Sequence, residues 1–258
     1  MSIKTHKAIS NAGEADYGKL SARNSTPAAK SILYGCEETS GTTLADYGTG
    51  ALTLTPGVLT FAGAANAVTV QQAAVDAGDL SLLAPVIGES WISFVCGQIT
   101  IDGSEVEFNL GSGTTRIEIK GGGNTSAISS PSGVSKAGLF IPGIPAAGSS
   151  QVGDDYFAAL VYDSTIGDTV SGALTLYGAT NTANFSTTLD KMTSYDGVAL
   201  LATSTISLSS LAAADVYAAG FRTFSGGLPA TFADDLASFY SYLKNGVKGW
   251  PADWLYLT

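Results

Sequence analysis

The feature that most constrains the fold is a succession of short β-type runs separated by turn residues. Thr115–Lys120 alternates, with Ile117 and Ile119 inward and charged residues outward, as a strand with one solvated face does. Trp91–Cys96 is apolar nearly throughout, which is typical of a central strand covered on both faces. Trp91 and Phe94 stand three apart in this strand and therefore face opposite sides. Because both faces of a central strand are covered, we expect both residues to be buried. Many short strands between turn signals favour two packed antiparallel sheets.

Runs with the composition of strands continue along the chain. They are Ser31–Tyr34, Ala51–Thr55, Val58–Phe61, Ala67–Val70, Glu105–Leu110, Tyr156–Tyr162, Ala173–Tyr177, Gly197–Ala202, Thr205–Leu208 and Val216–Phe224. Because Glu105–Leu110 and Thr115–Lys120 flank Gly111–Gly113, they predict a hairpin. The stretch 121–153 is rich in glycine and proline and predicts a loop, with a flexible turn at Gly121–Gly123.

One segment has the spacing of a helix. Pro229 opens it and Asn245-Gly246 ends it. Its apolar residues recur three or four apart and are Phe232, Leu236, Phe239, Tyr240 and Leu243. A single helix of this length is marginal alone in water. We therefore expect the helix at 229–245 to dock on a sheet face, with Trp250 and Trp254 beside the contact. The alternative is that the apolar stripe binds a neighbouring subunit.

The first 30 residues differ from the rest of the chain in charge. The whole chain has 12 Lys and Arg against 22 Asp and Glu, a net charge of -10, which argues against binding to nucleic acid. Residues 1–30 hold five of the basic residues but only two of the acidic ones. We expect an N-terminal arm at 1–30 that becomes ordered on a partner, followed by one domain at 31–258. A frayed terminus is the alternative.

Features that several other protein classes require are missing. No apolar run approaches the ~20 residues of a membrane helix, and the N-terminus has no apolar signal-peptide region. Cys36 and Cys96 are too few for a disulfide scaffold, so free thiols are expected and a bridge is the alternative. His6, the single histidine, lies in the arm, so no Ser-His or Cys-His nucleophile is expected.

Cys36–Leu54 resembles the opening of laminin-G-like domains of the concanavalin A-like superfamily. It reads as acidic residues, a Ser-Gly-Thr turn, an Asp, a Gly-rich turn and a short strand. The later matches follow in the family's order and are Leu59–Gly63, Val68–Val70, Ser90–Val95, Asp155–Asp163 and Leu174–Gly178. The resemblance spans about residues 31–245. It implies an all-β, antiparallel two-sheet jelly-roll sandwich with one C-terminal helix.

The end of the chain, Leu228–Trp254, resembles the ends of phage-encoded members of this class. This resemblance implies a virion protein made in the host cytoplasm. We expect a non-enzymatic structural component, either a capsid decoration protein or part of a tail or fibre. Its partners would be other virion proteins, reached through residues 1–30, and further copies of itself in a homo-oligomer.

Two alternatives to this function remain open. The first is a carbohydrate-binding module that reads a host surface glycan, which should present exposed aromatic side chains beside polar loop residues on one concave face. The second is a glucanase-like hydrolase. The glucanases that the chain resembles use Glu-x-Asp-x-x-Glu, whereas here Glu107 stands for the Asp and Leu110 for the closing Glu. Retaining enzymes need two carboxyl groups about 5 Å apart. We expect Glu105 and Glu107 to be hydrated strand residues, with no catalytic residue and no glycosidase activity.

The resemblance also implies a calcium site, because laminin-G-like domains often bind calcium through loop carboxylates. The candidate ligands are Asp46, Asp102, Asp154, Asp155 and Asp163. No EF-hand-like loop is present. The alternative for each is a turn-stabilising Asp that accepts hydrogen bonds from the nearby backbone. No other cofactor is expected.

Overall fold

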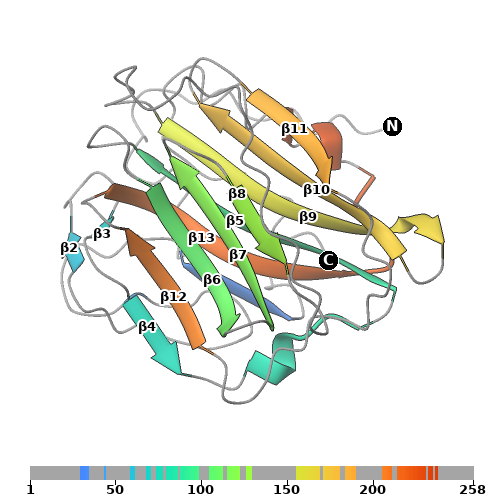
Figure 1. Ribbon diagram of the computed structural model, residues 1–258, viewed down its shortest axis with the longest axis horizontal. Coiled ribbons are helices and arrows are strands. Elements are labelled where there is room, and N and C mark those ends of the chain that lie inside the picture. Colours follow the sequence, from blue (N-terminus) through green and yellow to red (C-terminus); the bar gives the residue numbers. More distant parts are fainter. Residues whose placement is uncertain are drawn as a thin grey trace, which may run out of the picture.

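The computed structural model consists of two antiparallel β-sheets packed face to face (Figure 1). This confirms the all-β sandwich expected from the strand pattern. The residues that the structure describes are 30–34, 44, 59–61, 68–70, 74–77, 80–86, 88–98, 105–112, 115–122, 126–129, 155–168, 171–180, 184–189, 205–210, 214–230, 232–234 and 236–237.

The larger sheet has eight strands in the order β11-β10-β9-β5-β13-β3-β2, and β1 also pairs with β13. Its strands are β1 (Ser31–Tyr34), β2 (Leu59–Phe61), β3 (Val68–Val70), β5 (Glu89–Gln98), β9 (Asp155–Asp168), β10 (Ser171–Thr180), β11 (Asn184–Leu189) and β13 (Ala214–Ser225). The long strands β5, β9 and β13 form its centre. β1 and β3 share one side of β13, since β3 pairs with 214–216 and β1 with 219–222.

The smaller sheet has the order β4-β12-β6-β7-β8. Its strands are β4 (Ala74–Ala77), β6 (Glu105–Ser112), β7 (Thr115–Gly122), β8 (Ser126–Ser129) and β12 (Thr205–Ser210). A 3-10 turn, η4 (Leu80–Leu83), precedes β5. The predicted β6–β7 hairpin is confirmed, and its register places Phe108 opposite Ile119 and Leu110 opposite Ile117.

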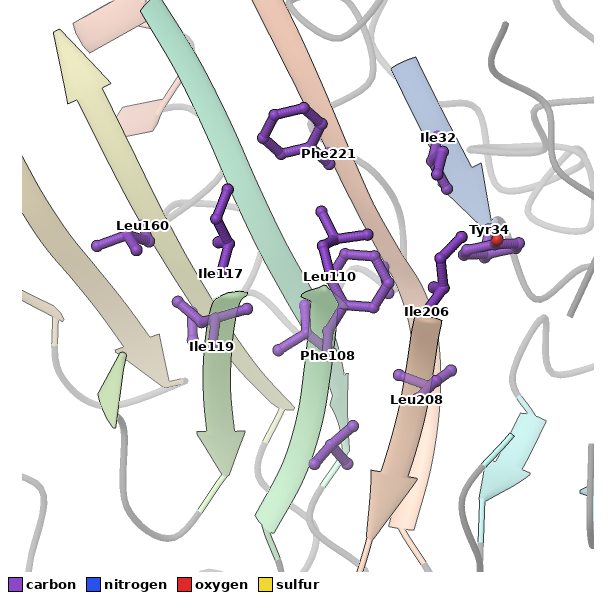
Figure 2. Packing of buried hydrophobic residues seen from close by; sticks show 14 of the residues in the cluster. Ile32, Tyr34, Phe108, Leu110, Ile117, Ile119, Leu160, Ile206, Leu208 and Phe221 are labelled. Atoms are coloured by element: carbon purple, nitrogen blue, oxygen red, sulfur yellow. The ribbon is translucent and has the colours of Figure 1, made fainter. Parts of the chain in front are cut away.

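The core between the sheets is built from the inward half of each alternating strand (Figure 2). Ile117 and Ile119 of β7 are buried completely and face side chains of the larger sheet such as Leu160 and Phe221. Trp91 stacks on Tyr162 with ring centroids 5.9 Å apart. Burial of these apolar side chains is the main stabilising contribution that holds the two sheets together.

A second apolar layer covers the other face of the larger sheet. Phe94 is buried there, on the side of β5 opposite Trp91, so the prediction that both residues lie in a core is confirmed. The described members of this outer apolar layer come from the strands and from the segment after β13. They are Leu33, Ile92, Phe94, Cys96, Phe157, Ala159, Val161, Ala218, Phe224, Phe232 and Leu236. The large sheet is therefore the middle layer of the molecule.

The segment after β13 begins as the apolar spacing predicts. Residues 232–234 and 236–237 are helical, and Phe232 and Leu236 are buried against the larger sheet. The rest of the helix expected at 229–245, with Trp250 and Trp254, lies outside the described residues. So do residues 1–29 of the expected arm and the strands expected at 51–55 and 197–202. No helix among the described residues is long and apolar enough to cross a membrane.

Two expectations about the loop region were wrong. Gly121 and Gly122 belong to β7, where they pair with Val106 and Glu105 of β6 and do not form a flexible turn. Residues 126–129, expected to be loop, form β8 at the edge of the smaller sheet. Both differences arise because a neighbouring strand supplies backbone hydrogen bonds that local composition does not reveal.

Candidate functional site

Polar and aromatic side chains gather on the outer face of the larger sheet along β9 and β10, towards its β11 edge. Towards β5 and β13 this face is buried and apolar, but along β9 and β10 it carries Asp163, Thr165, Thr175 and Tyr177. Asp163, Thr175 and Tyr177 are half-buried and Thr165 is exposed. We call these four residues the β9–β10 surface.

The strand register brings these residues together. In the β9–β10 pair, Ala159 lies opposite Tyr177, Val161 opposite Thr175 and Asp163 opposite Ala173. Because side chains alternate along a strand, Asp163 shares the outer face with Val161, a member of the outer apolar layer. The four residues therefore form a row along two neighbouring strands.

Tyr177 is the aromatic member of this row. Its ring meets that of Phe232 edge to face, with centroids 6.1 Å apart and an interplanar angle of 66°. Burial raises the pKa of the Tyr177 phenol, and the negative charge of Asp163 raises it further, while a side-chain hydrogen bond with Thr175 lowers it. The phenol is therefore neutral at physiological pH. It lies within the electrostatic reach of the Asp163 carboxylate.

Asp163 is held by Thr165, two residues further along β9. The backbone N–H and the hydroxyl of Thr165 both donate to Oδ1 of Asp163, at 2.9 and 2.7 Å. Among the residues that the structure describes, none donates to Oδ2. The carboxylate therefore has a fixed orientation, and with respect to the described residues Oδ2 remains available as an acceptor.

Hydrogen bonds fix the backbone beneath Asp163. The hydroxyl of Ser164 lies 3.0 Å from that of Ser90, and 3.0 and 3.2 Å from the carbonyl oxygens of Gly88 and Gly226. The N–H of Ser164 also donates to the Ser90 hydroxyl at 3.0 Å. These contacts connect the ends of β5, β9 and β13, so the strand that carries Asp163 is rigid at that point.

An ion pair lies at the same end of the larger sheet. Nζ of Lys30 is 2.8 and 2.9 Å from the two carboxylate oxygens of Glu89 and 3.3 Å from the carbonyl oxygen of Ala84. The backbone N–H of Thr223 donates to the carbonyl of Lys30 at 3.2 Å. Lys30, the last residue of the expected arm, is therefore anchored on the sandwich.

The outer face of the smaller sheet is the second polar surface. Its described side chains are half-buried and include Glu107, Asn109, Ser207 and Ser209. The register places Ser209 opposite Glu107 and Ser207 opposite Asn109. Oδ1 of Asn109 is buried and has no hydrogen-bond partner in the described part of the chain. The described side chains of this face include no aromatic ring.

The two carboxylates of the failed glucanase motif both lie in β6. The side chain of Glu107 is half-buried on the outer face, and that of Glu105 lies outside the described side chains. Leu110, at the position of the closing Glu, points into the core and is completely buried. The geometry of β6 therefore places no third acidic group beside Glu107.

The calcium candidates in the described part of the chain do not form one site. Asp155 and Asp163 lie eight residues apart on β9, a separation of about 27 Å along the strand. Asp155 is buried, 2% exposed, and accepts a hydrogen bond from Nε2 of Gln98 at 3.2 Å. No group of three His, Cys, Asp or Glu residues suited to a metal occurs among the described residues. Asp46, Asp102 and Asp154 lie outside them.

Only part of the β9–β10 surface could be predicted from the sequence. The sequence marks Asp163 as a calcium candidate and predicts Tyr177 only as a strand residue. What joins them is the pairing of β9 with β10, a contact between strands that no local motif encodes. The signal available beforehand was the polar end of an otherwise apolar strand, where Asp163 follows six residues that are mostly apolar.

No protein-family model matches the chain, and no curated protein matches its sequence. Among solved structures, it is similar to the binding domain of botulinum neurotoxin DC in complex with SialylT, with a TM-score of 0.49 and 8% identity over 82% of this chain. The chain spans about half of that neurotoxin domain, 51% of its length.

Two further solved structures illustrate the range of these likenesses. One is the CBM2 module of the evolved Dit of Lactobacillus casei BL23 phage J-1, with a TM-score of 0.40, 10% identity, and coverage of 75% of this chain and 96% of that one. The other is an engineered GH43 glycoside hydrolase, with a TM-score of 0.43, 11% identity, and coverage of 78% and 42%. At these scores the likenesses do not identify a function.

Proposed function

We propose that this chain is a non-enzymatic carbohydrate-binding β-sandwich that holds a glycan on the β9–β10 surface. The observation that carries the proposal is the half-buried Tyr177 in one row with Thr175 and Asp163 on one sheet face. A sugar ring presents apolar C–H groups on its faces and hydroxyl groups around its edge. A tyrosine ring offers an apolar face with a polar tip, and a carboxylate oxygen accepts hydrogen bonds from hydroxyl groups.

The rigidity of the surface supports this proposal. Phe232 fixes the ring of Tyr177 from one side, and Thr165 holds Asp163 by two hydrogen bonds. Side chains that are already fixed lose little conformational entropy when a ligand binds, which favours affinity. A binding module is expected to expose its aromatic rings, whereas Tyr177 is half-buried. The support for the proposal is therefore the fixed row of polar residues that continues from this ring on the same face.

The non-enzymatic part of the proposal is supported by β6. Glycosidases of the retaining type need two carboxyl groups about 5 Å apart. On β6 the residue three positions after Glu107 is Leu110, which lies in the core on the opposite face of the sheet. We expect no hydrolysis of β-glucans by the wild-type chain, and the matched control for any activity is the Glu105→Gln/Glu107→Gln double variant.

A glycan array tests the binding site directly. We expect the wild-type chain to bind a subset of glycans, and Tyr177→Ala to lower that binding at least about tenfold, because it removes the apolar platform. Glu107→Gln, on the other sheet, is the control and should bind like the wild type. A Tyr177→Ala variant that keeps its fold by circular dichroism and binds with full strength would exclude this surface.

We further propose that the module acts on a virion, as a decoration, tail or fibre component. The support is the concentration of basic residues in 1–30 of an otherwise acidic chain, and the anchoring of Lys30 by Glu89. Deletion of residues 2–25 leaves this anchor in place. We expect the deletion to abolish attachment to virion particles while the melting temperature stays unchanged. Full attachment after the deletion would contradict this role of the arm.

A further inference from the structure

We infer that the β9–β10 surface selects neutral oligosaccharides and rejects their anionic counterparts. This inference rests on the proposed function and deepens it by naming the chemical class of the ligand. Three observations support it: the carboxylate of Asp163 on the surface, the positions of the described basic side chains away from it, and the length of the row of four residues.

The charge on the surface itself is negative. Asp163 is the one acidic side chain of the row, and its carboxylate is one of the groups that raise the pKa of the Tyr177 phenol. Thr165 donates both of its hydrogen bonds to Oδ1 without neutralising the carboxylate. A glycan that reaches from Tyr177 to Asp163 therefore meets a carboxylate that no described basic side chain pairs with, and this carboxylate attracts hydroxyl donors and repels a second carboxylate.

The described basic side chains near this face are occupied elsewhere. Lys30 contacts both carboxylate oxygens of Glu89. Arg222 lies on the same face of the sheet but is only 4% exposed, and its guanidinium group lies 4.4 Å from the centre of the Phe224 ring. Arg222 on β13 lies opposite Ile92 on β5, and Ile92 lies opposite Val161 on β9. The backbone of Arg222 is therefore two strand spacings, about 10 Å, from that of Val161. Neither cation is placed to bind the carboxylate of an acidic sugar.

The charge of the whole chain acts in the same direction. With a net charge of -10, the molecule repels anions over distances comparable to the Debye length. Approach of an anionic glycan is therefore unfavourable before any contact is made. A neutral glycan experiences no such repulsion.

The row is long enough for more than one sugar. Ala173, opposite Asp163, is four residues from Tyr177 on β10, a distance of about 14 Å along the strand. This span exceeds a single pyranose ring. A ligand that uses both the ring of Tyr177 and the carboxylate of Asp163 is therefore an oligosaccharide of two or more units.

The test is an array in which each neutral oligosaccharide is printed beside its sialylated or uronic-acid counterpart and beside its component monosaccharides. We expect the wild-type chain to bind neutral oligosaccharides at least about tenfold more strongly than either. Asp163→Asn should reduce this discrimination between neutral and anionic glycans. Glu107→Gln removes the same charge from the opposite sheet and is the matched control, which should discriminate like the wild type.

The failures of the two proposals are distinguishable. Equal or stronger binding of the anionic counterparts would overturn the charge selectivity and leave glycan binding in place. Monosaccharide binding as strong as oligosaccharide binding would overturn the length argument. Unchanged discrimination in Asp163→Asn would show that this carboxylate does not set the selectivity. An array with no bound glycan would overturn the proposed function itself and the inference with it.

Discussion

Among single residues, Trp91 has a central position in the packing of the two sheets. It is completely buried, stacks on Tyr162 and meets the ring of Phe221 at 5.9 Å. Trp91→Ala should lower the free energy of unfolding by ~3–5 kcal/mol, because it removes a large apolar side chain and leaves a cavity. Leu82→Ala, at a side chain that is 73% exposed, is the control and should change it little. Denaturant unfolding measures both, and a Trp91→Ala midpoint equal to that of the wild type would contradict the placement.

Cys96 is a free thiol in the outer apolar layer, 1% exposed. Desolvation raises its pKa strongly, and the charge of Asp155 adds to the effect. In the Cys36→Ser variant, we expect Cys96 to resist a thiol reagent at pH 8 until the protein unfolds, because the thiolate is the reactive form. Since the unfolded thiol ionises near its ordinary value of 9.0, Cys96 destabilises the fold as the pH rises above that value. Rapid labelling without denaturant would contradict its burial.

The burial of Trp91 and Phe94 could be predicted because both lie in one nearly continuous apolar run, which is typical of a central strand. The role of Tyr177 could not be predicted in the same way. A tyrosine in Ala173–Tyr177 is compatible with a buried, half-buried or exposed position. Its neighbourhood is decided by the β9–β10 register and by Phe232, which comes from a segment 55 residues further along the chain.

At the scale of elements, β13 depends on a glycine where β1 and β5 approach it. A Cβ atom at Gly220 would lie 2.7 Å from the carbonyl oxygen of Ile32 and 2.9 Å from both Leu33 Cδ2 and Phe94 Cε1. We expect Gly220→Ala to cost ~1–3 kcal/mol of stability, because the strands must move apart. Ser225→Ala, at the exposed end of the same strand, is the control. Equal thermal melting of Gly220→Ala and the wild type would contradict the close packing of β1 on β13.

The sequence predicted the long inner strands and missed three short ones. β5, β6, β7 and β9 carry apolar or strictly alternating runs, and each was expected near its observed position. β4, β8 and β11 were not expected, and all three are edge strands of their sheets. An edge strand buries less apolar surface and is held largely by pairing with one neighbour, so its own composition is a weak signal.

For the whole molecule, the three-layer arrangement decides which surfaces remain available to a ligand. The inner face of each sheet lies in the core, and the outer apolar layer covers the centre of the larger sheet. Two polar surfaces remain among the described residues, the β9–β10 surface and the outer face of the smaller sheet. The first combines an aromatic ring with a fixed carboxylate, and the second is polar without a described aromatic side chain.

A backbone amide NMR titration distinguishes these two surfaces most directly. A neutral oligosaccharide that the array identifies is added to the labelled wild-type chain, and the shifts of its amide signals are followed. The account predicts that the largest shifts occur at Asp163, Thr165, Thr175 and Tyr177. Shifts concentrated at Glu107, Asn109, Ser207 and Ser209, with the β9–β10 signals unmoved, would contradict it.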